Sequence, residues 1–260
     1  MPDLTYASYL HIDRLLSLQE PRSKPAEHDE MLFIVIHQVY ELWFKEVLHE
    51  VEKVKRDFSA GDLFGAIHTF KRVRTIMKTL VGQLDILETM TPMSFSAFRD
   101  RLDTASGFQS FQFRELEFAL GYKRPEMLKF AAGPAAKAAI EKRLAEPSLI
   151  DHFYDFLEKH GAVLPQNLRA KPAEGANAPS EPLQREILRL YKARPELAIL
   201  FELMTDLDEG FQEWKYRHVK LVERTIGNKK GTGGSLGVTF LKESLFKPVF
   251  PDLWAIRHEL

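Results

Sequence analysis

The sequence has no cysteine among its 260 residues. This absence excludes disulfides, thiolate nucleophiles, zinc ribbons, iron–sulfur clusters and haem attached covalently through a CxxCH motif. No apolar run approaches the roughly 20 residues that a membrane-spanning helix needs. The start, MPDLTYASYLHIDR, also lacks the basic segment and following apolar run of a secretory signal. These absences predict a soluble, cytoplasmic protein with no membrane partner.

Charge of one sign is not in excess either. The 36 lysines and arginines nearly balance the 37 aspartates and glutamates. A chain with so little net charge has no electrostatic footprint for nucleic acid or an anionic membrane, so we expect neither as a partner. The content of 45% hydrophobic and 28% charged residues is ordinary for a globular protein. We therefore expect one domain spanning 1–260.

Alternation of apolar and polar residues with a period of two is nearly absent, whereas helical spacing recurs along most of the chain. This pattern predicts an all-α, single-domain helical bundle with long helices near 29–57, 62–90 and 195–226. Residues 161–186 are rich in Pro, Ala, Gly and Asn and have no periodicity, which predicts an irregular surface excursion. The segment GVTFL, at 237–241, is the only modest strand candidate.

Residues that favour helix ends support these ranges. Asp62 suits the cap of the second long helix. Pro195 suits the first turn of the third, and Gly227 suits its end.

Two histidines lie among apolar residues on predicted helices. His37 follows Phe33 and precedes Tyr40 by about one turn in FIVIHQVYELWFK. His218 follows Trp214 in the same way in EGFQEWKYRHVKLVERTIG. A neutral imidazole held by a helix beside an apolar cavity suits the axial ligand of a haem iron. Lone core histidines are also common, so the residues alone leave both interpretations open.

Two further features have a structural and a functional interpretation. Arg99 lies one turn after Phe95 in FSAFRDRL, where it could extend along apolar surface or pair with a ligand carboxylate. The loop KKGTGGSLG fits neither GxxxxGK[ST] nor GxGxxG and follows a helix, so it does not predict a phosphate site. It carries Thr232 and Ser235 just beyond the helix of His218, where a lid over a site would lie.

The amino-terminal arm, about 1–20, contains the amphipathic segment LTYASYLHIDRLL with Tyr6 and Tyr9 three residues apart. Terminal segments fray unless they are docked, so this apolar content implies packing. The surface that it covers belongs either to its own chain or to a neighbouring protomer.

Four segments occur together and in order, namely LTYASYL, HDEMLFIVIHQVYELWFKE, SGFQSFQFRELEFALG and RHVKLVERTIGNKKGTGGSLGV. With them, the chain from about residue 4 to residue 258 resembles the tryptophan 2,3-dioxygenase family, least strongly over 122–186. The resemblance implies an enzyme with haem b in its core, active with ferrous iron. Its expected reaction opens the indole ring of L-tryptophan with O2 to give N-formylkynurenine, the first step of the kynurenine pathway. It also implies a homotetramer with each amino-terminal arm exchanged into a neighbouring site.

The resemblance further implies roles for single residues. His218 matches the axial ligand of the haem iron, and the catalytic His37 matches the histidine that binds the indole N–H. Arg99 matches the residue that pairs with the substrate carboxylate. The other matching positions are Phe33 on the indole, Thr232 at the substrate ammonium and carboxylate, Phe95 beside the substrate, Ser106 at the haem edge, and Tyr6 and Tyr9 from an adjacent subunit. Phe95 departs from relatives that have tyrosine there.

Three other functions are compatible with parts of the pattern. They are a related haem dioxygenase acting on another indole derivative, a non-catalytic haem-binding sensor or carrier, and a helical interaction module whose histidines belong to its core. The joint presence of His37, Arg99 and Thr232 favours the enzyme, because a carrier needs none of them. Burial of His37 would keep its imidazole neutral and able to accept the indole N–H.

Overall fold

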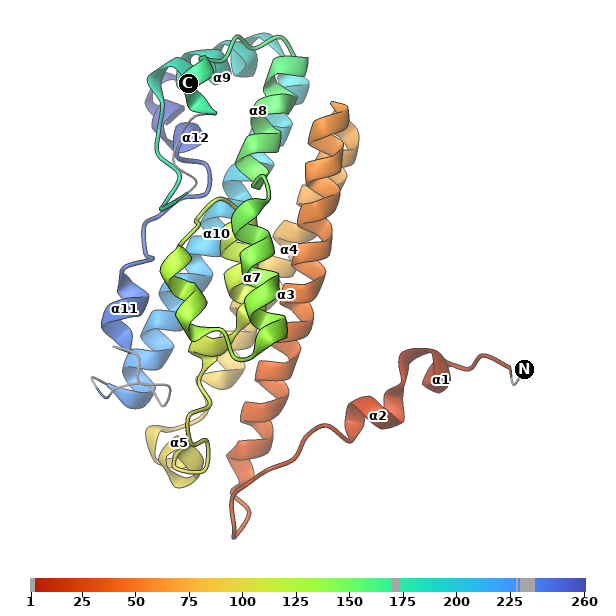
Figure 1. The fold of residues 1–260 in the computed structure, drawn as a ribbon, viewed down its shortest axis with the longest axis vertical. Helices are drawn as coiled ribbons and strands as arrows, with labels where there is room; N and C mark the ends of the chain where they lie inside the picture. Colours follow the sequence, from red (N-terminus) through yellow and green to blue (C-terminus); the bar gives the residue numbers. More distant parts are fainter. Residues whose placement is uncertain (1–2, 170–173, 228, 230–236) are drawn as a thin grey trace.

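Three long helices form the centre of the molecule (Figure 1). They are α3 (His28–Ala60), α4 (Leu63–Leu87) and α10 (Pro195–Ile226). The computed structural model describes residues 3–169, 174–227, 229 and 237–260. All three long helices lie close to the ranges that the sequence predicts, so the all-α class is confirmed.

The ends of the long helices follow from their sequence. Gly61 ends α3 with a left-handed φ of 74°, a conformation that glycine adopts without a steric penalty. The Asp62 carboxylate then accepts a hydrogen bond from the Gly65 amide at 2.9 Å and caps α4. Pro195 occupies the first turn of α10, and Gly227 follows its last residue with a φ of 60°. The predicted helix ends are therefore confirmed.

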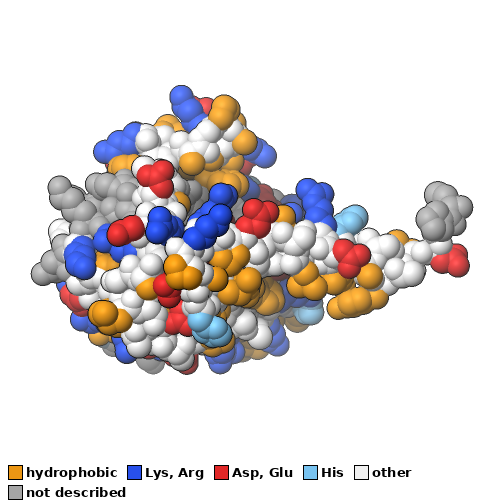
Figure 2. Space-filling model, turned by 90° about the horizontal axis from the view of Figure 1, so that it is seen from below, with side chains coloured by type: hydrophobic (Ala, Val, Ile, Leu, Met, Phe, Trp, Pro, Cys, Tyr) orange, Lys and Arg blue, Asp and Glu red, His pale blue; other side chains and the backbone are white. Residues whose placement is uncertain are grey.

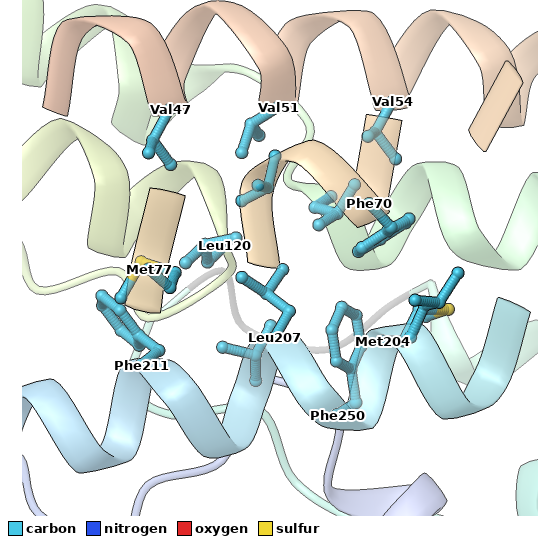
Figure 3. Close-up of a cluster of buried hydrophobic side chains, with 14 of the residues drawn as sticks. Val47, Val51, Val54, Phe70, Met77, Leu120, Met204, Leu207, Phe211 and Phe250 are labelled. Atoms are coloured by element: carbon cyan, nitrogen blue, oxygen red, sulfur yellow. The ribbon is translucent and has the colours of Figure 1, made fainter. Parts of the chain in front are cut away.

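The core lies where the three long helices face one another (Figure 3). Val47, Val51 and Val54, spaced three to four residues apart on α3, point toward residues of α4 and α10. The labelled side chains opposite them are Phe70 and Met77 of α4, Met204, Leu207 and Phe211 of α10, and Leu120 and Phe250 from connecting segments. Leu80 and Leu84 of α4 are fully buried in the same cluster. The fit between these three helices fixes the axis of the bundle.

Shorter helices surround this core. Along the chain they are α5 (Pro92–Arg99), η1 (Gly107–Gln109), α6 (Phe111–Ala119), η2 (Pro125–Phe130), α7 (Pro134–Ala145), α8 (Leu149–Lys159), η3 (Gln166–Leu168), α9 (Glu181–Ala193), α11 (Val238–Lys242), α12 (Pro251–Ala255) and η4 (Ile256–Glu259). Helices α5, α6 and α8 pack on α3. The fully buried Asp208 of α10 accepts hydrogen bonds from the Phe250 amide and the Trp254 indole, which holds the carboxyl-terminal segment on α10.

Two local predictions are wrong. The strand candidate GVTFL contains the start of helix α11, which packs against α10. Within the described residues this segment has no strand to pair with, so its β-branched residues do not decide its conformation. The irregular excursion ends earlier than residue 186, because α9 begins at Glu181. Pro182 lies in the first turn of α9, where the backbone N–H that proline lacks would have no partner within the helix.

The amino-terminal arm extends away from the bundle (Figure 1). It contains α1 (Tyr6–Leu10) and α2 (Ile12–Leu16), and none of the residues in these two helices is buried. The Gln19 side-chain amide donates to the Gln38 side chain at 2.6 Å, which ties the base of the arm to α3. Figure 2, which looks onto the end of the bundle that carries α5, shows hydrophobic side chains along the arm. Helices α1 and α2 thus bury none of their residues against the part of the chain that the structure describes.

No helix in the described ranges has both the length and the apolar character needed to cross a membrane.

Candidate active site

One end of the bundle gathers the residues that the sequence predicts for a site. The first turns of α3 carry His37, and the last turns of α10 carry His218. Helix α5 packs on both α3 and α10 and ends in Arg99. Segments far apart in the sequence therefore converge at this end (Figure 1).

His37 is held by its own helix. Its Nδ1 lies 2.7 Å from the carbonyl oxygen of Phe33 one turn earlier. Because a carbonyl can only accept, Nδ1 carries the proton, and Nε2 of the neutral ring is left as an acceptor. Burial lowers the pKa of His37 and outweighs the opposing effects of this hydrogen bond and of the Glu41 charge. At neutral pH the ring is neutral and presents a lone pair.

Aromatic rings form a wall beside His37. The Phe33 ring lies 4.0 Å from the imidazole, centroid to centroid. Helix α5 adds Phe95 and Phe98, whose rings lie 5.7 and 5.5 Å from that of Phe33. Arg99, the last residue of α5, is half-buried directly after this wall. The arrangement combines a flat apolar surface, a hydrogen-bond acceptor and a cation at one end of the bundle.

His218 is held by a stack of rings. Its imidazole is parallel to the Trp214 indole within 3°, at a centroid distance of 5.2 Å. Trp214 in turn meets Phe44 edge to face at 5.7 Å and Phe113 at 5.0 Å. These contacts fix the plane of the His218 ring.

The electrostatics of His218 link it to His37. Burial, together with smaller effects of positive charge on His37 and Arg114, lowers the pKa of His218 to about 4. The two imidazoles therefore lie within Coulombic reach of each other. Neither ring nitrogen of His218 has a hydrogen-bond partner in the described part of the chain. The ring is neutral at pH 7, and an unprotonated nitrogen is available to a metal.

The described residues contain no group of three histidine, aspartate or glutamate side chains that could hold a bare metal ion. A single rigid imidazole suits instead an iron that a macrocycle already holds, because a haem needs only axial ligands from the protein.

The remaining residues that the sequence predicts for the site differ in where they lie. Ser106 is half-buried, and its hydroxyl accepts from the Phe108 amide at 3.3 Å as the cap of η1. Tyr6 and Tyr9 are 78% and 67% exposed on the arm and so do not belong to the site of their own chain. Thr232 and Ser235 lie outside the described residues.

Of two supporting contacts, the sequence indicates one only by spacing and does not indicate the other. The first is the stack of Trp214 on His218, for which the spacing of four residues on one helix was the only signal. The second is Gln112 of α6, whose amide donates at 2.8 Å to both the carbonyl and the carboxylate of Glu41. Glu41 lies one turn after His37, so this contact ties α6 to the helix of His37. No sequence signal pairs residues so far apart.

Comparison with known proteins identifies the family of this chain. A family model described as tryptophan 2,3-dioxygenase matches residues 1–201 and 187–260. A tryptophan 2,3-dioxygenase of Herpetosiphon aurantiacus is 52% identical over 257 residues, which cover 99% of this chain and 98% of the relative. One of Anaeromyxobacter sp. strain K is 53% identical, covering 99% and 96%, and one of Caulobacter vibrioides is 43% identical, covering 99% of each. The resemblance seen in the sequence is confirmed: this chain belongs to the tryptophan 2,3-dioxygenase family.

Proposed function

We propose that this protein is a haem-dependent dioxygenase that inserts O2 across the indole C2–C3 bond of L-tryptophan and gives N-formylkynurenine. The observation that carries the proposal is the pair of neutral imidazoles, His37 and His218, at one end of the bundle beside an aromatic wall. The curated relatives named tryptophan 2,3-dioxygenase match nearly the whole chain, which supports the same reaction.

His218 is the residue that would bind the iron of haem b. Its stacking on Trp214 fixes the ring, and its low pKa keeps a nitrogen free of protons. Ser106 would border the edge of the macrocycle. When bound in the ferrous state, haem supplies the activation of O2 that amino-acid side chains cannot provide. The protein's own residues then bind the substrate, orient it and exclude water.

The residues around His37 suit an amino acid with an indole ring. Phe33 and Phe95 offer apolar surface to the ring, and the bare Nε2 of His37 can accept its N–H. Arg99 can pair with the α-carboxylate through two parallel hydrogen bonds. We assign Thr232 a contact with the substrate ammonium and carboxylate. Fixing both ends of the substrate in this way aims the C2–C3 bond at one point.

The exposed arm supports an assembly in which each site is completed by a second chain. Tyr6 and Tyr9 expose most of their rings to water as part of an apolar stripe on the arm. Such an exposed apolar surface is typical of a contact with another protein. We propose that they pack at the site of a neighbouring protomer within a homotetramer. We also propose a cytoplasmic location.

One experiment tests the reaction. The purified protein is loaded with haem, reduced without oxygen, and followed spectroscopically while tryptophan and O2 are added. We expect a haem spectrum and the appearance of N-formylkynurenine. Binding of tryptophan without product would indicate a sensor or carrier. Turnover of another indole in preference to tryptophan would indicate a different substrate.

The axial ligand is tested by His218→Ala. We expect this variant to retain much less haem than the parent while keeping its helical content, because loss of one ring at the end of the bundle leaves the buried contacts of α3, α4 and α10 in place. His68→Ala, at a histidine on the surface of α4, is the control. Normal haem retention by His218→Ala would contradict the assignment.

The carboxylate contact is tested by Arg99→Lys and Arg99→Ala. A charge-assisted hydrogen bond contributes about 1.5–3 kcal/mol, so tryptophan affinity should fall by at least about tenfold in Arg99→Ala. The tryptophan affinity of Arg99→Lys should lie between those of the parent and of Arg99→Ala, because an ammonium cannot form the two parallel hydrogen bonds. Affinity for tryptamine, which has no carboxylate, should change little. Equal losses for tryptophan and tryptamine would refute the role of Arg99.

A further inference from the structure

A group of buried charges lies beside the proposed haem site. We call Arg114, Arg124 and Lys215, which surround Glu117, the cation cluster. Their nitrogens lie 2.5, 2.6 and 3.4 Å from the Glu117 carboxylate oxygens. Glu117 is fully buried, and the three cations are 6%, 6% and 4% exposed. All four side chains are thus removed from water.

The charges of this group do not balance. Three cations face a single carboxylate, and no other carboxylate of the described chain forms an ion pair with any of them. Moving an ion out of water is unfavourable unless an opposite charge compensates it. The Nε atoms of Arg114 and Arg124 are also buried without a hydrogen-bond partner in the described chain. The cluster therefore has an excess of positive charge, together with two unused donors and one unused acceptor, Oε1 of Glu117.

Aromatic rings line the cluster and compensate it only in part. Arg114 lies over the rings of Phe108 and Phe113 at 5.3 and 5.4 Å. Lys215 lies 4.5 Å from the centre of the Phe211 ring. A ring face attracts a cation but carries no net charge, so the excess charge remains. An anion from outside the chain is the group that would remove it.

The position of the cluster points to the source of that anion. Lys215 lies one turn before His218 on α10, and the charge of Arg114 acts on His218 directly. Arg114 also covers Phe108, two residues after Ser106. The cluster therefore lies next to the proposed iron ligand His218 on α10 and beside the segment that follows Ser106.

We propose that the cation cluster binds a carboxylate of the prosthetic group, namely a propionate of haem b. Two guanidinium groups and one ammonium group suit a carboxylate, because arginine offers paired donors and lysine a point charge. Glu117 holds the cations in place but leaves positive charge for the ligand. This inference rests on the proposed haem-dependent function and deepens it.

The test compares haem with its dimethyl ester, which has the same ring and iron but no negative carboxylates. Binding to the full-length protein is measured as the rate at which each compound transfers to an apomyoglobin scavenger. The wild-type protein should retain haem longer than the ester. Lys215→Met removes one cation and keeps most of the apolar stem. It should speed the loss of haem by about tenfold to a hundredfold, the effect of one charge-assisted bond, and leave the loss of the ester unchanged.

The matched control is Lys220→Met on the same helix, where the lysine is 52% exposed and pairs with Glu223. It should change neither rate. The thermal midpoint of apo Lys215→Met should be no lower than that of the wild type, because removal of an uncompensated charge relieves the apo protein. This midpoint separates loss of a ligand contact from loss of the fold.

Several results would overturn the inference. Equal faster loss of haem and ester from Lys215→Met would mean that Lys215 is only structural. Equal retention of haem and ester by the wild-type protein would mean that no propionate is bound there. If inorganic phosphate raised the thermal midpoint of the apo protein through Lys215 without any preference for haem over ester, the cluster would be a site for free anions. A wild-type protein that held neither compound would refute the haem-dependent function itself.

Discussion

Glu117→Gln is the substitution whose effect follows most directly from the structure. It replaces the one carboxylate that faces Arg114, Arg124 and Lys215 with a neutral amide of the same size. Burial alone would raise the pKa of Glu117, and the three cations reverse this and hold it at about 2. Compared with 4.5 for an ordinary glutamate, this difference corresponds to about 3 kcal/mol in favour of the charged form.

A second argument gives a similar magnitude. Removal of one partner from a buried ion pair costs about 3–5 kcal/mol, because the other charge remains in the interior. We therefore expect Glu117→Gln to lower the free energy of unfolding of the apo protein by about 3–5 kcal/mol. Urea unfolding of the apo protein at pH 7, followed by circular dichroism, measures it. The folded pKa lies below the unfolded value, so the stabilisation is complete above pH 4.5 and is lost as the pH falls through about 2.

Glu223 provides the control. Its pKa also lies at about 2, because of hydrogen bonds to Lys220 and Lys242. Both lysines are half-exposed, and water screens such a pair, so Glu223→Gln should change the stability very little. The two variants thus remove carboxylates of equal acidity from different surroundings. If Glu117→Gln were no more destabilising than Glu223→Gln, burial would not be the cause of the difference, and the reasoning would fail.

Three further predictions concern stability and catalysis. Because the pKa of His218 falls from 6.5 to about 4 on folding, only the unfolded chain takes up this proton between those values. The unfolding free energy of the apo protein should therefore fall as the pH drops from 6.5 to 4, by on the order of 3 kcal/mol, and His218→Ala should flatten this slope in pH-dependent urea unfolding. Leu80→Ala, at a fully buried position of α4, should cost about 2–5 kcal/mol in urea, whereas Ile86→Ala at a half-exposed position should cost far less. His37→Ala should lower kcat/KM for tryptophan more than for 1-methyltryptophan, which has no indole N–H to donate, and equal losses would refute the hydrogen-bond role.

Periodicity predicted most of the fold because the long helices carry continuous apolar stripes. The stripe of α3 and the caps at Asp62 and Pro195 are local features, so the sequence states them directly. The strand prediction for GVTFL failed because the conformation of five residues depends on what they pack against. The early start of α9 was missed because Pro182 was taken to interrupt a helix, whereas it lies in the first turn, where proline is tolerated.

The candidate site was predictable in part. The helical spacing of Phe33 and His37, and of Trp214 and His218, indicated an aromatic neighbour for each imidazole. The family resemblance supplied the proposed roles of the two histidines. The cation cluster was not predictable. Arg114 and Glu117 form a pair at i and i+3 that also occurs on exposed helices, and only the tertiary structure adds Arg124 and Lys215 from distant segments.

The contact between α4 and α10 along the bundle has a consequence for biosynthesis. Most of the chain separates His37 from His218, and α10 supplies a central part of the core as well as the second imidazole. A ribosome must therefore complete α10 before the nascent polypeptide has either a closed interior or His218, the proposed iron ligand. Uptake of the proposed haem would then mark a chain that already contains α10, and fragments that end before α10 should emerge colourless and prone to degradation.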